Sequence, residues 1–111
     1  MVKIMQKKRT EIVHSSTQAG QYRIKCPSHE IKEGLAELSA NGFRLFMYLT
    51  TCNSGWNFDD DNMCKVLGFK SVRTLQGYRK ELKALGYLHV AKGKEVDVYY
   101  VGKQAVEMFK G

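Results

Sequence analysis

The hydrophobic pattern changes its period at Gly86, and this change is the strongest constraint on the fold. Over residues 71–85 apolar side chains recur at helical spacing, and Gly86 stands in the position that ends a helix. Beyond it the pattern alternates over residues 87–91 and again over residues 95–101, and Lys92-Gly93-Lys94 joins the two stretches. This is typical of a β-hairpin, because glycine supplies the positive φ that a tight turn needs. The sequence therefore predicts a helix followed at once by a hairpin.

Two further helices are expected before this one. Ser39 is an N-cap candidate for a helix that ends near Asn53-Ser54-Gly55, and apolar residues cover much of its circumference. Asp59 can cap a short helix that Gly68 closes, with more acidic side chains in its positively polarised first turn. Gly68 and two more residues then separate this short helix from the next, for which Ser71 is the N-cap candidate.

The N-terminal quarter is interpreted as a basic arm followed by a small hairpin. Residues 1–9 carry basic side chains without periodicity. Residues 10–14 and 21–26 show the alternation of two short strands around a turn, which predicts an N-terminal β-hairpin extension. In the second stretch Arg23 and Lys25 alternate with apolar residues, so this strand has one basic face.

Two short helices complete the predicted elements. Ser28 can cap a helix that runs to Leu38. Its apolar positions at helical spacing are Ile31, Leu35 and Leu38. Residues 103–110 can form a last short helix. Its apolar side chains are Ala105, Val106 and Phe109.

Charge points to a polyanionic partner. The 111 residues suffice for one domain, to which residues 10–111 are assigned, and its net charge of +7 is large for this size. The excess lies at the two ends, with +5 over residues 1–27, −2 over residues 28–70 and +4 over residues 71–111. No apolar run approaches the length of a membrane span or a secretory signal, and three cysteines show no Cys-x-x-Cys spacing. The protein is expected to be cytoplasmic, with reduced thiols and no membrane partner.

Catalysis and metal binding find little support. The three histidines have no sequence context that marks a general base, and no phosphate-binding Gly-rich loop or nucleophile motif is present. Asp59-Asp60-Asp61-Asn62 is interpreted as helix capping, because a calcium loop needs acidic ligands at alternating positions around a glycine. Cys26 and His29 have a ligand-like spacing, but a structural zinc site needs four ligands. We expect no enzyme activity, no metal and no cofactor.

The last long helix presents a polar face that suits DNA. Its inward positions are Val72, Leu75, Tyr78, Leu82 and Leu85. Its outward positions are Arg73, Thr74, Gln76, Gly77 and Lys80, with Ser71 at the helix start. Arginine can bind guanine and glutamine can bind adenine through two hydrogen bonds each. The candidate DNA-binding residues are Ser71, Arg73, Thr74, Gln76 and Lys80 on the helix, Lys92 and Lys94 in the hairpin turn, and Arg23 and Lys25 near the N-terminus.

Residues 39–101 resemble the winged-helix domains of bacterial regulators, and especially the N-terminal domains of plasmid and phage replication initiators. The resemblance rests on the run from Leu38 to Leu49 followed by Trp56, on residues 66–76 as the turn into the recognition helix, and on residues 81–88 as the exit into the wing. It implies an α+β winged helix-turn-helix with a three-helix core and a β-hairpin wing. The family often has a long basic side chain where this sequence has Gly77.

The expected function is sequence-specific binding of double-stranded DNA in a bacterial plasmid or phage. The resemblance implies an accessory role in replication or in recognition of a conjugative transfer origin, or a small transcriptional regulator. Replication or relaxosome proteins are then further partners, and a homodimer through the N-terminal hairpin or the last helix fits the sequence. The alternatives are a protein-interaction module without DNA specificity, marked by exposed Tyr99 or Phe109, and a single-strand or RNA binder, marked by clustered aromatic and basic residues.

Overall fold

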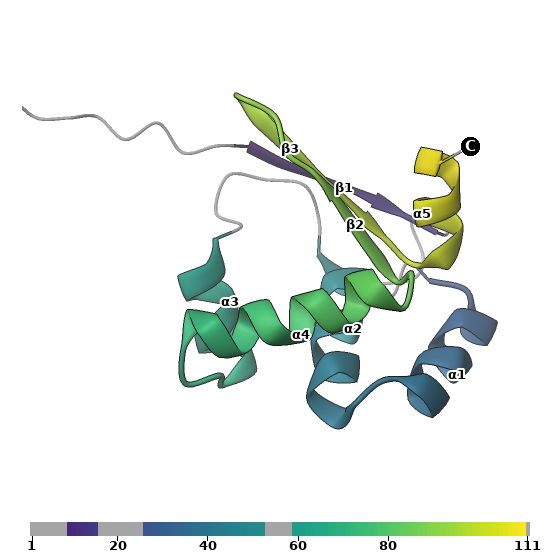
Figure 1. The fold of residues 1–111 in the computed structure, drawn as a ribbon, viewed down its shortest axis with the longest axis horizontal. Coiled ribbons are helices and arrows are strands. Elements are labelled where there is room, and N and C mark those ends of the chain that lie inside the picture. The colour runs from purple at the N-terminus through teal and green to yellow at the C-terminus, as the bar shows by residue number, and fades with distance from the viewer. Residues whose placement is uncertain (1–8, 16–25, 53–58, 111) are drawn as a thin grey trace, which may run out of the picture.

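The computed structural model describes residues 9–15, 26–52 and 59–110. The elements are β1 (Arg9–His14), α1 (Ser28–Glu37), α2 (Ala40–Thr51), α3 (Asp60–Leu67), α4 (Val72–Ala84), β2 (Leu88–Ala91), β3 (Val96–Val101) and α5 (Lys103–Lys110) (Figure 1). Over these ranges the protein has an α+β fold, as predicted, with five helices and one mixed sheet of three strands.

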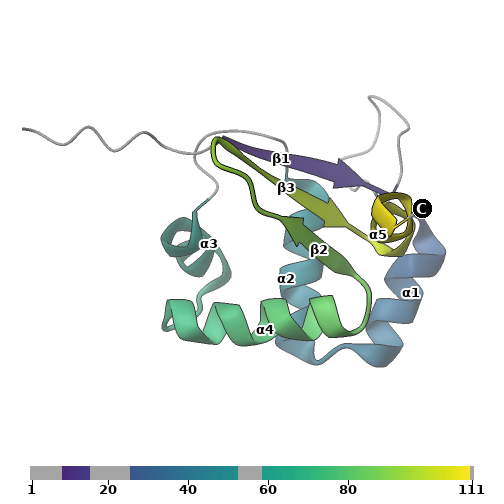
Figure 2. The same cartoon turned by 45° about the horizontal axis from the view of Figure 1, so that its top comes forward.

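The sheet has the strand order β1-β3-β2, so the last strand of the chain lies in its centre. β2 and β3 are antiparallel, which confirms the hairpin predicted after Gly86. β1 pairs in parallel with β3, with Ile12 opposite Tyr99. In both views the sheet lies over α2 and α4, and α5 lies at the end of the sheet opposite the β2–β3 turn (Figures 1 and 2).

The N-terminal strand pairs with a strand that was not predicted as its partner. β1 begins at Arg9, which the sequence places in the basic arm, and it extends the sheet of the β2–β3 hairpin. Cys26, predicted as the end of a second strand, lies in a bend before α1 with its side chain buried. The rest of that predicted strand, with Arg23 and Lys25, lies outside the described residues.

Local side-chain capping sets most helix starts. Ser39, Asp59 and Ser71 each accept a hydrogen bond from the backbone N–H three residues later, at 3.0, 2.7 and 3.2 Å, which confirms all three predicted N-caps. The predicted Ser28 cap is wrong, because Ser28 is the first residue of α1 and Pro27 is the N-cap. The φ of Pro27 is −61°, and its carbonyl oxygen accepts the N–H groups of Glu30 and Ile31 at 3.0 and 3.3 Å.

Glycine ends two helices and shapes the hairpin turn. Gly68 and Gly86 have φ of 73° and 84°, which confirms them as left-handed helix ends. The prediction that Gly93 supplies a positive φ is wrong, since it is absent from the positive-φ glycines. Space requires a glycine there instead, because an added Cβ would lie 2.5 Å from the carbonyl oxygen of Val96. The Gly93 N–H donates to Asp97 Oδ1 at 3.2 Å and closes the turn.

The hydrophobic core lies between α2, α4 and the sheet. Leu75 and Leu82 of α4 are fully buried, as predicted, and Val72 and Tyr78 are half-buried against the same core. The ring of Phe46 on α2 meets the ring of Tyr87 edge to face, with centroids 5.1 Å apart. This packing holds α4 under the sheet and leaves its other side to solvent.

Two apolar residues that were predicted to face the core, Leu85 and Leu35, are exposed. Leu85 is 39% exposed, because it is the C-cap of α4 and its backbone has left the helical conformation. Leu35 is 63% exposed, because the buried face of α1 runs through Glu30, Gly34 and Leu38 at a spacing of four. An added Cβ on Gly34 would lie 3.3 Å from both Leu38 and Phe43, so the glycine lets α1 approach α2 closely.

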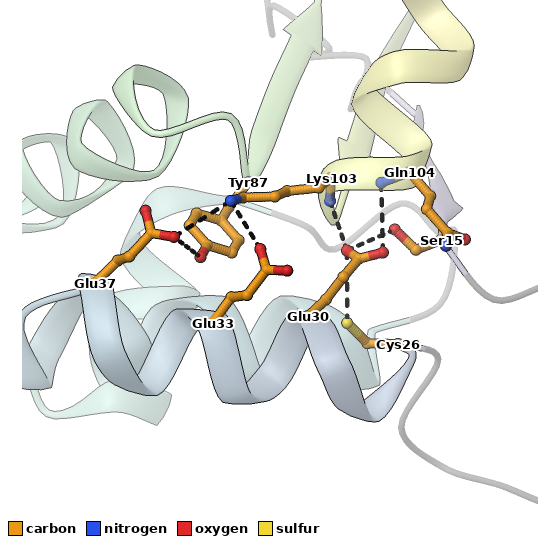
Figure 3. Close-up of polar contacts among 8 residues, drawn as sticks. All are labelled: Ser15, Cys26, Glu30, Glu33, Glu37, Tyr87, Lys103 and Gln104. Atoms are coloured by element: carbon orange, nitrogen blue, oxygen red, sulfur yellow. Dashed lines mark hydrogen bonds and ion pairs between the residues drawn. The ribbon is translucent and has the colours of Figure 1, made fainter.

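A buried carboxylate joins α1 to α5. Glu30 is 1% exposed, and its Oε1 accepts the Lys103 N–H at 2.6 Å and the Ser15 hydroxyl at 3.0 Å (Figure 3). Its Oε2 accepts the Gln104 N–H at 3.4 Å. These N–H groups begin α5, so the carboxylate also meets the positive end of the helix dipole. Burial and Glu30 raise the pKa of the neighbouring Cys26 thiol to about 12, so this thiol stays protonated.

The Lys103 side chain forms a second link between the same helices. Its Nζ lies 2.9 Å from Glu33 Oε2 and 3.3 Å from Glu37 Oε1, over the ring of Tyr87 (Figure 3). A hydrogen bond from Lys103 lowers the pKa of Glu33, and its bonds to Glu33 and Glu37 raise the pKa of Lys103. α1 and α5 are therefore held together by charge as well as by burial.

Replacing Lys103 by Met should lower the free energy of unfolding by an amount that depends on pH. Because the folded pKa of Glu33 lies below its ordinary 4.5, the ion pair stabilises the fold above that pH and is lost as the pH falls through the folded value. Urea unfolding followed by circular dichroism should show the difference between the two proteins shrinking from pH 6 to pH 3. A constant difference over this range would contradict the ion pair.

Candidate nucleic-acid interface

The solvent side of α4 carries a strip of polar and basic side chains. All the predicted contacts of this helix are exposed: Ser71, Arg73, Thr74, Gln76 and Lys80. At about 100° of rotation per residue, Arg73, Gln76, Lys80 and the unpredicted Lys83 fall within about 80° of the circumference. We call these four residues the α4 strip. With a rise of about 1.5 Å per residue, the strip is about 15 Å long.

Two of the predicted contacts lie outside the α4 strip. Ser71 Oγ accepts the Thr74 N–H at 3.2 Å and lies 3.1 Å from the Thr74 hydroxyl. Both hydroxyls therefore serve the cap that starts α4. On the helix circumference Thr74 lies about 100° away from Arg73. The structure brings Arg73, Gln76 and Lys80 together and separates Ser71 and Thr74 from them.

The positive charge of the α4 strip is not neutralised by an acidic side chain of the same helix. Glu81 is the only acidic residue of α4, and its carboxylate binds the N-terminus of α2, accepting from Ser39 N–H and Ser39 Oγ at 2.7 Å each. Within the described residues, no ion pair is formed by Arg73, Lys80 or Lys83. The outward side of α4 is thus positive without local compensation.

The β2–β3 hairpin adds positive charge next to α4. Lys92 and Lys94 are both exposed at its turn, as expected, and within the described residues neither forms an ion pair. Lys92 joins α4 at a cavity, whereas Lys94 is not among the residues that line it. The other predicted contacts, Arg23 and Lys25, lie outside the described residues.

A cavity of about 190 Å³ lies between α3, α4 and the hairpin. Its lining consists of Asp60 from α3, of Gln76, Arg79, Lys80 and Lys83 from α4, and of Val90 and Lys92 from the hairpin. Three of these seven side chains, Gln76, Lys80 and Lys83, belong to the α4 strip, so the strip and the cavity form one surface. We call this surface, with Arg73, the basic face.

Lys83 is one residue of the basic face that was not predicted from the sequence. Its pKa is lowered by burial and by the positive charges of Arg79, Lys92 and Lys80. The signal was available, because Lys83 follows Lys80 by three residues and Arg73 by ten, which keeps it on the same side of a helix. The predicted outward positions of the helix ended at Lys80, and Lys83 was therefore not included.

Arg79, another lining residue of the cavity, links three elements. It was assigned to neither side of the helix, and its guanidinium lies 2.8 Å from Asp60 Oδ1 and donates to the Tyr99 hydroxyl at 2.8 Å. These contacts join α3, α4 and β3. Arg79 therefore holds the hairpin at a set position beside α4, and its own charge is largely neutralised by Asp60.

Comparison with protein-family models, with curated proteins and with solved structures finds no match for this chain. None of the helices in the described ranges has the length and apolar character that crossing a bilayer requires. The same ranges contain no group of three or more His, Cys, Asp or Glu side chains arranged to hold a metal ion.

Proposed function

We propose that the protein binds double-stranded DNA in a sequence-specific manner and that its fold is a winged helix-turn-helix. In this assignment α2, α3 and α4 form the three-helix core, α4 is the recognition helix and the β2–β3 hairpin is the wing. The order of the elements supports it, with Gly68 and a short turn between α3 and α4 and a hairpin directly after Gly86. β1 then completes the sheet of the wing.

The observation that carries the proposal is the basic face. Four cations, Arg73, Lys80, Lys83 and Lys92, lie along α4 and the wing without an ion pair in the described chain. Like charges held together destabilise a fold unless a partner compensates them, and a polyanion is the partner that such a surface fits. An α-helix enters the major groove with its N-terminal residues on base edges, where Arg73 and Gln76 would lie.

The biological setting follows from the resemblance to plasmid and phage replication initiators. We propose a cytoplasmic, non-catalytic protein of a bacterial mobile element that acts in replication, in recognition of a transfer origin or as a small transcriptional regulator. Replication or relaxosome proteins would be its further partners. DNA sites recovered beside an origin or a promoter would distinguish these roles.

Replacing Arg73 by Ala should relax the sequence preference. A bidentate contact between arginine and guanine contributes about 1–3 kcal/mol of discrimination, so preference at one base pair should fall about 5- to 150-fold. Selection from a random duplex pool with wild type, Arg73→Ala and the α1 variant Lys32→Ala measures it. Identical recovered motifs for wild type and Arg73→Ala would remove Arg73 from base readout.

A protein-interaction role is the second candidate function, favoured by exposure on α5. Phe109 is 47% and Met108 59% exposed, although Phe109 stacks on His89 with centroids 4.0 Å apart. Tyr99, the other marker of this role, is buried at 6% exposure. Glu107 and Lys110 flank the apolar pair with opposite charges, so two antiparallel copies of α5 would place them opposite each other. The partner that fits is a second copy of this chain.

Sedimentation velocity tests this second candidate. The wild type should sediment as a dimer at micromolar concentration, and Met108→Gln should sediment as a monomer with an unchanged circular dichroism spectrum. A monomeric wild type would count against the α5 surface, and it would leave the basic face and its DNA role as they are.

A further inference from the structure

We infer that the cavity between α3, α4 and the hairpin is a binding site for a single phosphate group, supplied by the backbone of a nucleic acid. The assignment of the phosphate to a backbone rests on the proposed DNA binding. The presence of the anion site rests on the cavity itself. These two parts can fail separately.

The lining has the chemistry of an anion site. Three lysines, Lys80, Lys83 and Lys92, converge on the cavity from two elements, and the Gln76 amide adds a neutral donor. Asp60 is the one carboxylate of the lining, and it is bound to Arg79 at 2.8 Å. The positive side chains exceed the negative ones by three, and the excess belongs to groups without an ion pair in the described chain. A phosphate would accept charge-assisted hydrogen bonds from each lysine.

Besides burial, the positive charges around the cavity lower the pKa of Lys83, so these cations repel one another. The pKa of Lys83 is lowered by burial and then by Arg79, Lys92 and Lys80. A negative charge placed among these groups would stabilise the charged form of Lys83 and raise its pKa again. Binding of an anion and protonation of Lys83 are therefore coupled.

Size and surroundings favour a backbone phosphate over a free nucleotide. Pockets that enclose whole small-molecule ligands have volumes of about 300–1,000 Å³, and this cavity has about 190 Å³. The Asp60 carboxylate in its wall disfavours a ligand with several negative charges, whereas a phosphodiester carries one. Gln76, Lys80 and Lys83 belong to both the cavity and the α4 strip, so a strand that follows the strip would place a phosphate there.

The first arm of the test uses inorganic phosphate. Titrated into isotope-labelled protein at constant ionic strength, it should shift the NMR signals of residues 76–83 and Lys92 in a saturable way. It should also raise the pKa measured at Lys83 Nζ. Lys83→Gln should weaken the apparent affinity at least fivefold, Lys83→Arg should retain it, and the matched α1 variant Lys32→Gln should leave it unchanged.

The second arm uses duplex DNA of random sequence. The slope of log affinity against log salt should lose about 0.9 of its magnitude in Lys83→Gln, because one phosphate contact is lost. Lys83→Arg and Lys32→Gln should keep the wild-type slope. All sequences should be weakened alike, since a phosphate contact carries no sequence information.

Each of the other possible results of these two experiments overturns a specific part of the proposal. Absence of saturable phosphate shifts in the cavity overturns the anion site, even if DNA binds elsewhere on the basic face. Phosphate binding with an unchanged DNA salt slope in Lys83→Gln overturns the backbone source and assigns the cavity to a small free phosphate. Phosphate binding in a protein that does not bind DNA at all supports the anion site and overturns both its backbone source and the proposed function.

Discussion

Replacing Arg73, Lys80 and Lys83 together by glutamine should lower the affinity for duplex DNA on the order of a hundredfold at 0.15 M salt. Each phosphate contact contributes about −0.9 to the slope of log affinity against log salt, so the loss of Lys80 and Lys83 removes about 1.8 from its magnitude. The loss of the Arg73 base contact lowers the affinity for the recognised site further, by about 1–3 kcal/mol. All three side chains are exposed and have no ion pair within the described chain, so their loss should leave the fold intact. Fluorescence anisotropy with a labelled duplex, repeated from 0.05 to 0.3 M salt, measures affinity and slope together.

The matched control removes three positive charges from other helices. Lys32 on α1, Lys65 on α3 and Lys110 on α5 are exposed lysines outside the cavity and the α4 strip. Glutamine at these three positions lowers the net charge equally and should weaken binding only a few-fold. Equal losses in the two triple variants would mean that total charge attracts DNA and that α4 has no special part.

Replacing Glu30 by Ala should destabilise the fold by about 3 kcal/mol. The substitution removes the acceptor of the first N–H groups of α5, which are partly buried, and the nearer acceptor of the buried Ser15 hydroxyl, which keeps only Val101 O at 3.5 Å. Glu30→Gln keeps the shape but loses the charge, so we expect it to be intermediate. Urea unfolding followed by circular dichroism at pH 7 measures the free energies.

The exposed Glu95→Ala in the hairpin turn serves as the control and should change stability by less than about 0.5 kcal/mol. A loss below about 1 kcal/mol in Glu30→Ala would contradict the role of this carboxylate at the start of α5. The DNA affinity of the folded fraction should remain near that of the wild type, because Glu30 lies outside the basic face.

Elements that depend on near neighbours in the sequence could be predicted. The caps at Ser39, Asp59 and Ser71 and the stops at Gly68 and Gly86 involve bonds or dihedral angles within a few residues. The β2–β3 hairpin joins adjacent stretches and has the same local character. These features define the order of helices and strands on which the fold assignment rests.

Contacts between distant parts of the chain could not be predicted. β1 and β3 are separated by most of the sequence, and a short alternating stretch such as β1 carries no signal for its parallel partner. Glu30 is a charged residue, and only the position of α5 shows why α1 buries it. Leu35 was placed on the apolar side of α1 because its spacing from Ile31 and Leu38 is helical. The face that is buried runs through Glu30 and Gly34 instead, and the pattern of apolar residues alone did not identify it.

The candidate site was partly predictable. Arg73, Gln76 and Lys80 follow from helical periodicity, and the structure places them on one strip with Lys83. The cavity needed three-dimensional information, because Asp60, Arg79 and Lys92 come from three elements that only the fold brings together. Ser71 was predicted both as the N-cap of α4 and as a DNA contact, since capping and DNA contact favour the same residue types.

The most direct test of DNA recognition by the basic face is selection of duplexes from a random pool, followed by salt titration of the recovered site and of a shuffled control. We expect one short motif whose complex survives about 0.15 M salt while the shuffled duplex dissociates. Dissociation of both duplexes at the same salt concentration would show that α4 does not read sequence, and it would contradict the proposed function.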